Sequence, residues 1–216
     1  MIMMKAALFD LDGVVFDTEG QYSDFWGRQF RTYYPGSSGM EQRIKGQTLG
    51  QIFDAYFPDA DVQERIVAEL ENFEQGMRFP YVDGFADFVA DLRACGVRTA
   101  IVTSSNRQKM SVVYANCPKL TDMFDAILTS EDFSFSKPHP DCYEKAAARL
   151  DAQRDECVVF EDSFNGLRSG RSAGMRVVGL STTNVADDIK PLSDVVISDY
   201  LGLDYEKITT LLSVCR

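Results

Sequence analysis

Histidine is nearly absent from this 216-residue sequence, and His139 is its single copy. The five cysteines, an odd number, are widely spaced and form no Cys-x-x-Cys pair, so we expect most of them to be free thiols that pack as small apolar side chains. These shortages argue against a multi-histidine or zinc site, a disulfide scaffold and a histidine-based catalytic triad. If the protein catalyses a reaction, carboxylates must carry much of the chemistry.

An excess of positive charge is also missing. The 22 Lys and Arg residues stand against 33 Asp and Glu residues, which gives a net charge of −11. Such a charge repels the phosphates of nucleic acids and of anionic lipids, so we expect neither a nucleic acid nor a membrane as a partner. No apolar run reaches the roughly 20 residues of a membrane span, and residues 1–10 do not have the pattern of a signal peptide. We therefore expect a cytoplasmic protein.

Short β-rich apolar runs alternate with segments of helical period from residue 81 onward. This alternation predicts an α/β fold with a Rossmann-like parallel sheet and helices on its faces. One helix is expected from Phe85 to Cys95, with Asp83 as its N-cap and Gly96 as its end, and two more at residues 142–150 and 164–173. The predicted strands are Lys5–Phe9, Val97–Val102, Asp125–Leu128, Cys157–Phe160, Arg176–Leu180 and Asp194–Ile197.

Residues 18–80 contain no comparable strand. Aromatic and aliphatic side chains recur there near the 3.6-residue period, which predicts three helices, the third capped by Asp61. A loop is expected at Pro35–Gly39, between the first two helices. The sequence thus predicts a core made of residues 1–17 and 81–216, with a small helical domain of residues 18–80 inserted into it.

Polar residues follow the ends of several predicted strands, where ligands bind in open parallel sheets. Clustered carboxylates repel one another unless a cation lies between them, and oxygen ligands favour Mg²⁺. A lysine and hydroxyl groups beside such an ion suit the transfer of a phosphoryl group. Each pattern alone also fits a turn, a helix cap or a solvated loop, but their order along successive strand ends favours a single site. The residues are Asp10, Asp12, Thr103, Ser104, Lys137, Glu161 and Asp162.

Four segments in this order resemble the successive motifs of the haloacid dehalogenase superfamily, in its subgroup of β-phosphoglucomutase-like phosphatases. They are Phe9–Glu19 (FDLDGVVFDTE), Ile101–Asn106 (IVTSSN), Ser136–Asp141 (SKPHPD) and Val159–Leu167 (VFEDSFNGL). The helical insertion after the first motif resembles the small cap domain of that subgroup.

The resemblance implies a role for each matching residue. Asp10 would be the nucleophile that becomes an aspartyl-phosphate, and Asp12 the general acid and then base. Thr103, Ser104 and Lys137 would hold the phosphoryl group. Mg²⁺ would lie on Asp10, the backbone carbonyl of Asp12, Glu161 and Asp162. An acid at position 12 also argues against carbon–halogen hydrolysis, because a halide leaves without a proton whereas an alkoxide needs one.

Two outcomes of the phosphoryl transfer remain open, since the group can pass to water or to a sugar hydroxyl. A mutase of this subgroup has a histidine and an arginine in its cap where this sequence has Tyr22 and Leu49. Residues 18–80 also carry six basic and ten acidic side chains, which does not favour the binding of a second phosphate. We therefore expect a phosphatase of small phosphate esters, sugar phosphates above all, with a phosphomutase as the alternative.

The choice of substrate is expected to depend on the cap, through Tyr22, Lys45, Gly46, Gln47 and Thr48. A small mobile cap over the site admits small phosphorylated metabolites and excludes bulk water when it closes. A non-catalytic protein that binds such metabolites is a further alternative, but binding alone requires neither a nucleophile nor an acid. No large apolar surface is indicated, so we expect a monomer.

Overall fold

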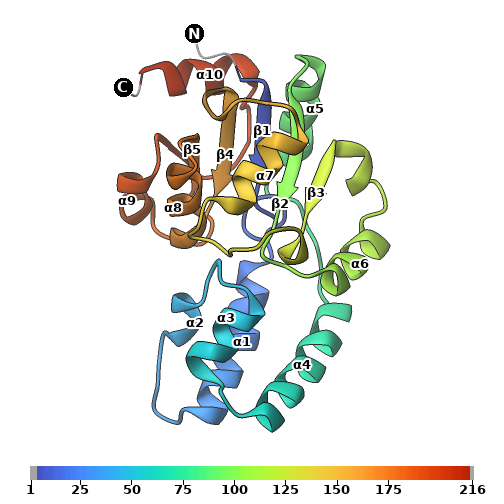
Figure 1. Ribbon diagram of the computed structural model, residues 1–216, viewed down its shortest axis with the longest axis vertical. Coiled ribbons are helices and arrows are strands. Elements are labelled where there is room, and N and C mark those ends of the chain that lie inside the picture. The colour runs from blue at the N-terminus through green and yellow to red at the C-terminus, as the bar shows by residue number, and fades with distance from the viewer. Residues whose placement is uncertain (1–3, 215–216) are drawn as a thin grey trace.

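The computed structural model describes residues 4–214 of the chain (Figure 1). Its centre is a six-stranded sheet, and every pair of neighbouring strands is parallel. The strand order is β3-β2-β1-β4-β5-β6, which confirms the predicted α/β fold class. The strands are β1 (Ala6–Phe9), β2 (Arg98–Val102), β3 (Ala126–Leu128), β4 (Cys157–Glu161), β5 (Arg176–Leu180) and β6 (Val195–Ile197).

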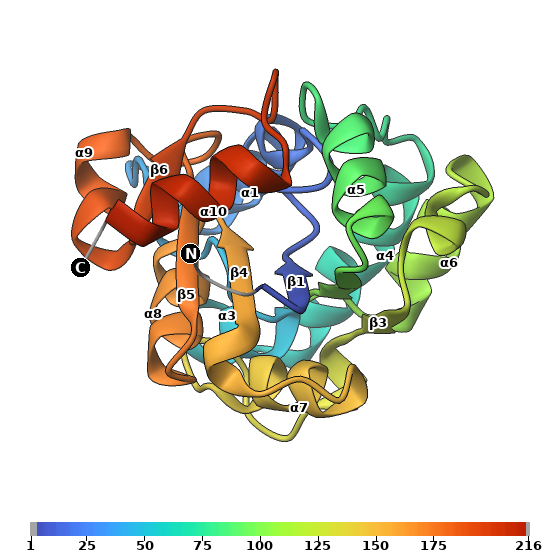
Figure 2. The same ribbon diagram turned by 90° about the horizontal axis from the view of Figure 1, so that it is seen from above.

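Helices cover both faces of the sheet (Figure 2). Successive side chains of a strand point to opposite faces, so Ala7 and Phe9 of β1 join one apolar cluster while Ala6 and Leu8 join the other. The first cluster includes side chains of α5 (Phe85–Ala94), α6 (Arg107–Asn116) and α10 (Tyr205–Val214). The second includes those of α7 (Asp141–Arg149), α8 (Phe164–Ser172) and α9 (Ala186–Ile189). Burial on both faces explains why the strands are continuous apolar runs.

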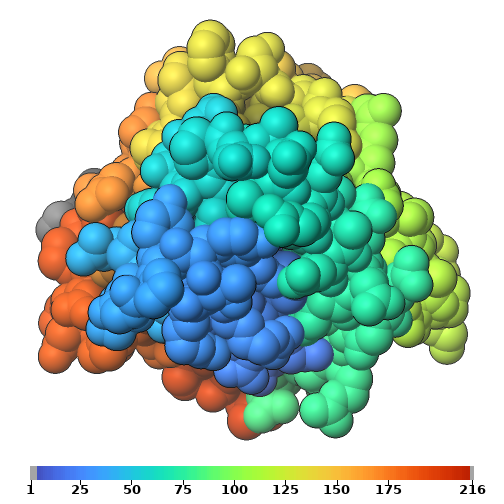
Figure 3. Space-filling model, turned by 90° about the horizontal axis from the view of Figure 1, so that it is seen from below, coloured from blue at the N-terminus to red at the C-terminus, as the bar shows by residue number. Residues whose placement is uncertain are grey.

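The insertion between β1 and α5 is helical, as predicted. Its helices lie at the carboxyl ends of the strands (Figure 1), and seen from below they cover the middle of the molecule (Figure 3). They have an apolar cluster of their own that contains Phe25, Phe30 and Ile66. The helices are α1 (Glu19–Tyr33), α2 (Met40–Arg43), α3 (Leu49–Tyr56) and α4 (Ala60–Gln75).

The two ends of the insertion lie side by side where the chain leaves the core and returns to it. The backbone N–H of Asp17 donates to the carbonyl of Pro80 at 2.9 Å, and Phe16 forms an antiparallel bridge with Tyr81. This closure lies where the sequence predicts the boundary between residues 1–17 and 81–216 on one side and 18–80 on the other. The division into two domains itself stays a prediction.

Two predicted helix caps are wrong. Asp59, not Asp61, caps α4, because its Oδ1 accepts the N–H groups of Asp61 and Val62 at 2.9 and 3.2 Å. Gly84, not Asp83, is the N-cap of α5, in a left-handed conformation with φ of 78°. A Cβ at Gly84 would collide with the backbone of Tyr200, so the chain needs glycine there.

Several elements have no counterpart in the predicted set. Besides the helices α2, α6, α9 and α10, the described residues include four 3₁₀ helices, at Leu120–Met123, Ser130–Asp132, Arg154–Glu156 and Lys190–Leu192. The four described cysteines are free thiols, of which Cys142 and Cys157 are buried. Cys215 and the first three residues, which entered the predictions on thiols and on a signal peptide, lie outside the described residues. No helix within residues 4–214 has the length and apolarity to cross a membrane.

Candidate active site

Three carboxylates meet at the carboxyl ends of the two central strands. Asp10 follows β1 directly, Glu161 is the last residue of β4, and Asp162 comes next in the chain. One oxygen of each lies within 4.8 Å of the others. β1 and β4 pair in register from Ala6 to Phe9, and the backbone N–H of Asp10 donates to the carbonyl of Phe160 at 3.0 Å. The parallel pairing therefore brings these acids together, as the sequence predicted.

Lys137 binds two of the three acids. Its Nζ donates to Asp10 Oδ1 at 2.6 Å, to Glu161 Oε1 at 2.7 Å and to the carbonyl of Val102 at 3.0 Å. Only 1% of the lysine side chain is exposed, so the ammonium lies behind Asp10 and away from solvent. Tyr143 adds a hydroxyl that donates to Glu161 Oε1 at 3.0 Å. Lys137 thus orients the Asp10 carboxylate and screens its charge.

Burial of these acids, together with their mutual repulsion, opposes their ionisation. Burial raises the pKa of Asp10 to about 7, and the charges of Glu161 and Asp12 add to the rise while Lys137 opposes it. Burial also raises the pKa of Asp162 well above its usual range, helped by the charges of Glu19, Glu161 and Asp10. A set of buried oxygen donors that repel one another suits a hard divalent cation, which would relieve the repulsion.

Neighbouring backbone and hydroxyl groups pack closely against Asp162 and Glu161. Gly13 has a φ of 76°, and a Cβ there would collide with Oδ2 of Asp162. Asp162 also accepts a hydrogen bond from the hydroxyl of Thr183. Oε2 of Glu161 accepts from Ser163 Oγ at 3.0 Å and from the backbone N–H groups of Asp162 and Ser163. Because Glu161 already has five donors, Asp10 and Asp162 have more freedom to bind an ion.

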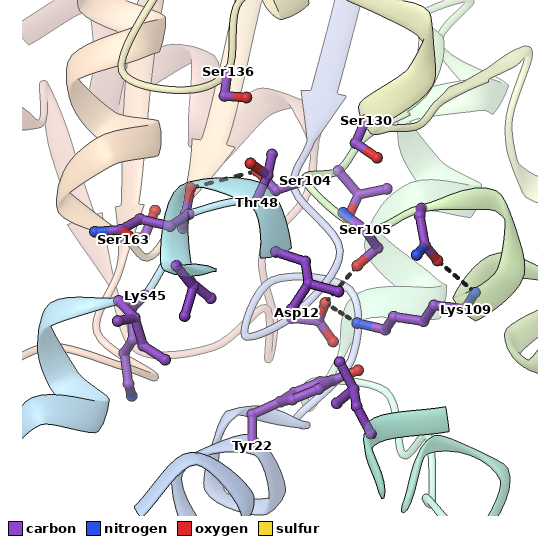
Figure 4. A pocket seen from close by; sticks show the side chains of 18 of the residues that line it. Asp12, Tyr22, Lys45, Thr48, Ser104, Ser105, Lys109, Ser130, Ser136 and Ser163 are labelled. Carbon is purple, nitrogen blue, oxygen red and sulfur yellow. Dashed lines mark hydrogen bonds and ion pairs between the residues drawn. The ribbon is translucent and has the colours of Figure 1, made fainter. Parts of the chain in front are cut away.

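The carboxylate of Asp12 does not belong to the cluster of three acids and has its own partners. Its Oδ1 accepts from Thr18 Oγ1 at 2.6 Å, and its Oδ2 accepts from Ser105 Oγ at 3.3 Å. Lys109 forms an ion pair with the same Oδ2 (Figure 4). The carboxylate is 14% exposed and lines the cavity described below. It is therefore held in one position at the cavity wall, as a proton donor or acceptor must be.

The three predicted phosphate-binding residues differ in how they contact the site. Thr103 is buried after β2, and its Oγ1 accepts the N–H of Ser105 at 3.0 Å. Ser104 Oγ donates to the carbonyl of Gly46 at 3.4 Å. Thr103 and Ser104 line the cavity with Asp10, whereas Lys137 is not among the lining residues. Lys137 therefore acts on the cavity indirectly, through its ion pair with Asp10.

A cavity of about 470 Å³ lies between the helical insertion and the core, large enough for a small phosphorylated molecule. All five predicted specificity residues line it: Tyr22, Lys45, Gly46, Gln47 and Thr48. Lys45 pairs with Glu19 at 3.2 Å, and Thr48 caps α3. Figure 4 shows Lys45 and Thr48 on the same side of the cavity as Ser163 of the core.

Three polar contacts close the insertion onto the core. Besides the bond of Ser104 to Gly46, Asn165 Nδ2 donates to the carbonyl of Lys45 at 3.4 Å and Gln51 Nε2 to that of Lys137 at 3.4 Å. Gly46 has a φ of 73°, and a Cβ there would collide with the hydroxyl of Ser163. The structure therefore shows a closed arrangement of insertion and core.

Lys109, Glu19 and Glu74 belong to the cavity wall but are missing from the predicted site. The amino group of Lys109 lies 4.4 Å from the ring centre of Tyr22, whose hydroxyl donates to Glu74 Oε1 at 2.9 Å. A signal for Lys109 does exist, since it is the third residue of the helix that starts after the polar strand end at residues 103–106. Glu19 and Glu74 have no comparable local signal, because only packing of the insertion brings them to the cavity.

Comparison with known proteins gives consistent results. Residues 7–180 match the model of a family described as haloacid dehalogenase-like hydrolase. The chain is 30% identical over 196 residues to protein CbbY of Cereibacter sphaeroides, covering 82% of this chain and 84% of that one. It is 29% identical over 204 residues to validoxylamine A 7'-phosphate phosphatase of Streptomyces hygroscopicus subsp. limoneus, covering 91% and 94%. The crystal structure of a HAD hydrolase, family IA, variant 3, from Entamoeba histolytica superposes with a TM-score of 0.82 at 22% identity, covering 97% of this chain and all of that one.

Proposed function

Because the chain belongs to the haloacid dehalogenase-like hydrolase family, we propose that it is a Mg²⁺-dependent phosphatase of small phosphate esters that works through an aspartyl-phosphate. The family match confirms the resemblance seen in the sequence, and a relative named as a phosphatase supports a phosphoric monoester hydrolase. One observation carries the proposal: Asp10 lines the cavity with Lys137 behind it, and Asp12 is fixed two residues away.

In the first half-reaction, a carboxylate oxygen of Asp10 attacks phosphorus and the bond from phosphorus to the ester oxygen breaks. Lys137 orients the Asp10 carboxylate, while Thr103 and Ser104 offer hydroxyl groups to the phosphoryl oxygens. Asp12 donates its proton to the departing alkoxide. Water then attacks phosphorus, Asp12 takes up a proton from it, and the bond between Asp10 and phosphorus breaks. Inorganic phosphate and the free nucleophile result.

A magnesium ion suits the acids present. Asp10, Glu161, Asp162 and the carbonyl of Asp12 would hold it. When bound, Mg²⁺ would offset the negative charges of these acids and of the phosphoryl group, which otherwise repel each other. The fit rests on the buried oxygen donors, since burial first and the charges of the neighbouring acids second raise the pKa values of Asp10 and Asp162.

Residues 18–80 act in this proposal as a cap that selects the substrate. Tyr22, Lys45, Gly46, Gln47 and Thr48 line the cavity on the side of the cap. The only cations among the described lining residues are Lys45 and Lys109, and each is paired with a carboxylate. A second phosphate would therefore find no unpaired cation there, which favours monophosphates and hydrolysis over phosphomutase activity.

Phosphate release from a panel of sugar phosphates tests the proposal. We expect release that depends on Mg²⁺, stops with EDTA and disappears in Asp10→Asn. With β-glucose 1-phosphate and a catalytic amount of the bisphosphate, release of phosphate should outpace formation of glucose 6-phosphate. A wild-type protein that releases no phosphate from the whole panel contradicts a phosphatase, and faster formation of glucose 6-phosphate indicates the mutase.

A further inference from the structure

Lys109 is a buried cation on the wall of the cavity, and the proposed chemistry gives it no role. Its helix, α6, begins after Asn106, whose Oδ1 accepts the backbone N–H of Lys109 at 2.9 Å. This cap fixes the start of the helix and thereby the place of Lys109. The residue is only 4% exposed, and its amino group forms an ion pair with Oδ2 of Asp12 (Figure 4).

Two helices of the cap surround the same amino group. The ring of Tyr22, from α1, lies 4.4 Å from it, and the hydroxyl of Tyr22 donates to Glu74 of α4 at 2.9 Å. The negative charges of Glu74 and Glu19 also act on this region: burial raises the pKa of both carboxyls, and the charge of Lys109 opposes that rise in each. A buried ammonium is costly unless it is paired, so these contacts together with Asp12 keep Lys109 in place.

The geometry points to Lys109 as a positioning residue for Asp12, an inference that rests on the proposed phosphatase function. Thr18 holds one oxygen of the Asp12 carboxylate, and Lys109 with Ser105 holds the other. Lys109 therefore acts through Asp12 and fixes the direction in which its proton is delivered. Because Tyr22 belongs to the cap and donates to Glu74 of the same cap, the closed cap contributes to the contacts of Lys109, and through Lys109 to the placement of Asp12.

Two substrates with different leaving groups can distinguish the positioning of Asp12 from a role of Lys109 in substrate binding or folding. An alkoxide needs a proton from Asp12 as it departs, whereas p-nitrophenolate leaves without one. Values of kcat/KM report the steps through formation of the aspartyl-phosphate, so we compare them for a sugar phosphate and for p-nitrophenyl phosphate. Lys109→Met keeps the length of the side chain and removes its charge. Lys109→Arg keeps the charge, and Asp12→Ala serves as the reference for complete loss of the acid.

The expected result for Lys109→Met is a loss of roughly 10-fold or more in kcat/KM for the sugar phosphate, with less than about 3-fold loss for p-nitrophenyl phosphate. Asp12→Ala should shift the ratio in the same direction and further, and Lys109→Arg should recover part of it. Lys145→Met is the matched control, because it removes a partly exposed ion pair to Asp141 on α7. It should leave the ratio unchanged.

Equal losses for the two substrates in Lys109→Met would overturn the inference, because substrate binding or folding would then explain the effect. If Lys109→Met is poorly folded, Ser105→Ala provides the second test, since it removes a weaker contact to the same oxygen of Asp12 and should shift the ratio in the same direction by a smaller factor. An unchanged ratio in a folded Ser105→Ala would count against positioning of Asp12. A wild-type protein that releases phosphate from neither substrate would instead contradict the proposed function.

Discussion

Replacement of Lys137 by methionine should destabilise the protein strongly. The lysine side chain is 1% exposed and forms ion pairs with Asp10 at 2.6 Å and with Glu161 at 2.7 Å, and Glu161 is fully buried. Its loss leaves two buried carboxylates facing each other without the cation between them. Breaking a buried ion pair costs about 3–5 kcal/mol, and here one substitution breaks two. We therefore expect Lys137→Met to lie at or above the upper end of that range.

The assay is unfolding by urea and by heat, in buffer with EDTA so that no divalent ion compensates for the lost charge. For a chain of this length, 3–5 kcal/mol corresponds to a fall in Tm of about 6–20 °C. The control Lys145→Met, at a partly exposed ion pair, should change stability by less than about 1 kcal/mol. In Lys137→Met/Glu161→Gln the second substitution removes the uncompensated charge, so the double variant should be less destabilised than the sum of the two single ones. A loss below about 1 kcal/mol in Lys137→Met, or full additivity, would refute the reasoning.

Three further outcomes are expected. Asp12→Ala should lose roughly 10²–10⁴-fold in sugar-phosphate turnover yet keep the rise in Tm on addition of Mg²⁺, because its carboxylate is not among the three clustered acids; loss of that rise would contradict the assignment. Gly46→Val should lower kcat/KM by roughly 10²-fold, since its Cβ collides with Ser163 in a left-handed backbone conformation; steady-state kinetics that match Gly20→Ala, which adds a methyl group in open space, would show that the loop tolerates the change. Burial raises the pKa of Asp132, but hydrogen bonds, chiefly from Thr129, outweigh it and hold the pKa below its usual range. The stability that its ionised form gives is present above the unfolded-state pKa and is lost as pH falls through the folded-state pKa, so the advantage of wild type over Asp132→Asn in urea unfolding should shrink on acidification; a constant difference would contradict this.

Much of the site follows from one property of parallel sheets, which is that the carboxyl ends of neighbouring strands share an edge. Asp10, Thr103 and Glu161 each lie at or directly after a strand end, so the sequence order of strands and polar residues was enough to predict their meeting. Lys137 belongs to the same edge but comes from a loop, and only the structure shows that it contacts Asp10 and Glu161 from behind.

The cavity wall on the cap side was less predictable. Tyr22 and Lys45 were expected there from their places in the insertion, but Glu74 lies near the end of α4, on a helix whose acids have the pattern of a solvated face. Packing of α4 against α6 turns Glu74 toward Tyr22. The position of Lys109 likewise depends on where α6 begins and on how the cap closes. Such contacts between segments far apart in the sequence leave no periodic pattern within either segment.

The central claim is that Asp10 becomes covalently bound to the phosphoryl group. Rapid quenching of the enzyme with a ³²P-labelled sugar phosphate, followed by peptide mapping, tests it most directly. The account predicts acid-stable label on the peptide that contains Asp10, with a lifetime that shortens as turnover rises, and no label in Asp10→Asn. Steady release of phosphate without any labelled protein, or label on a peptide that lacks Asp10, would contradict it.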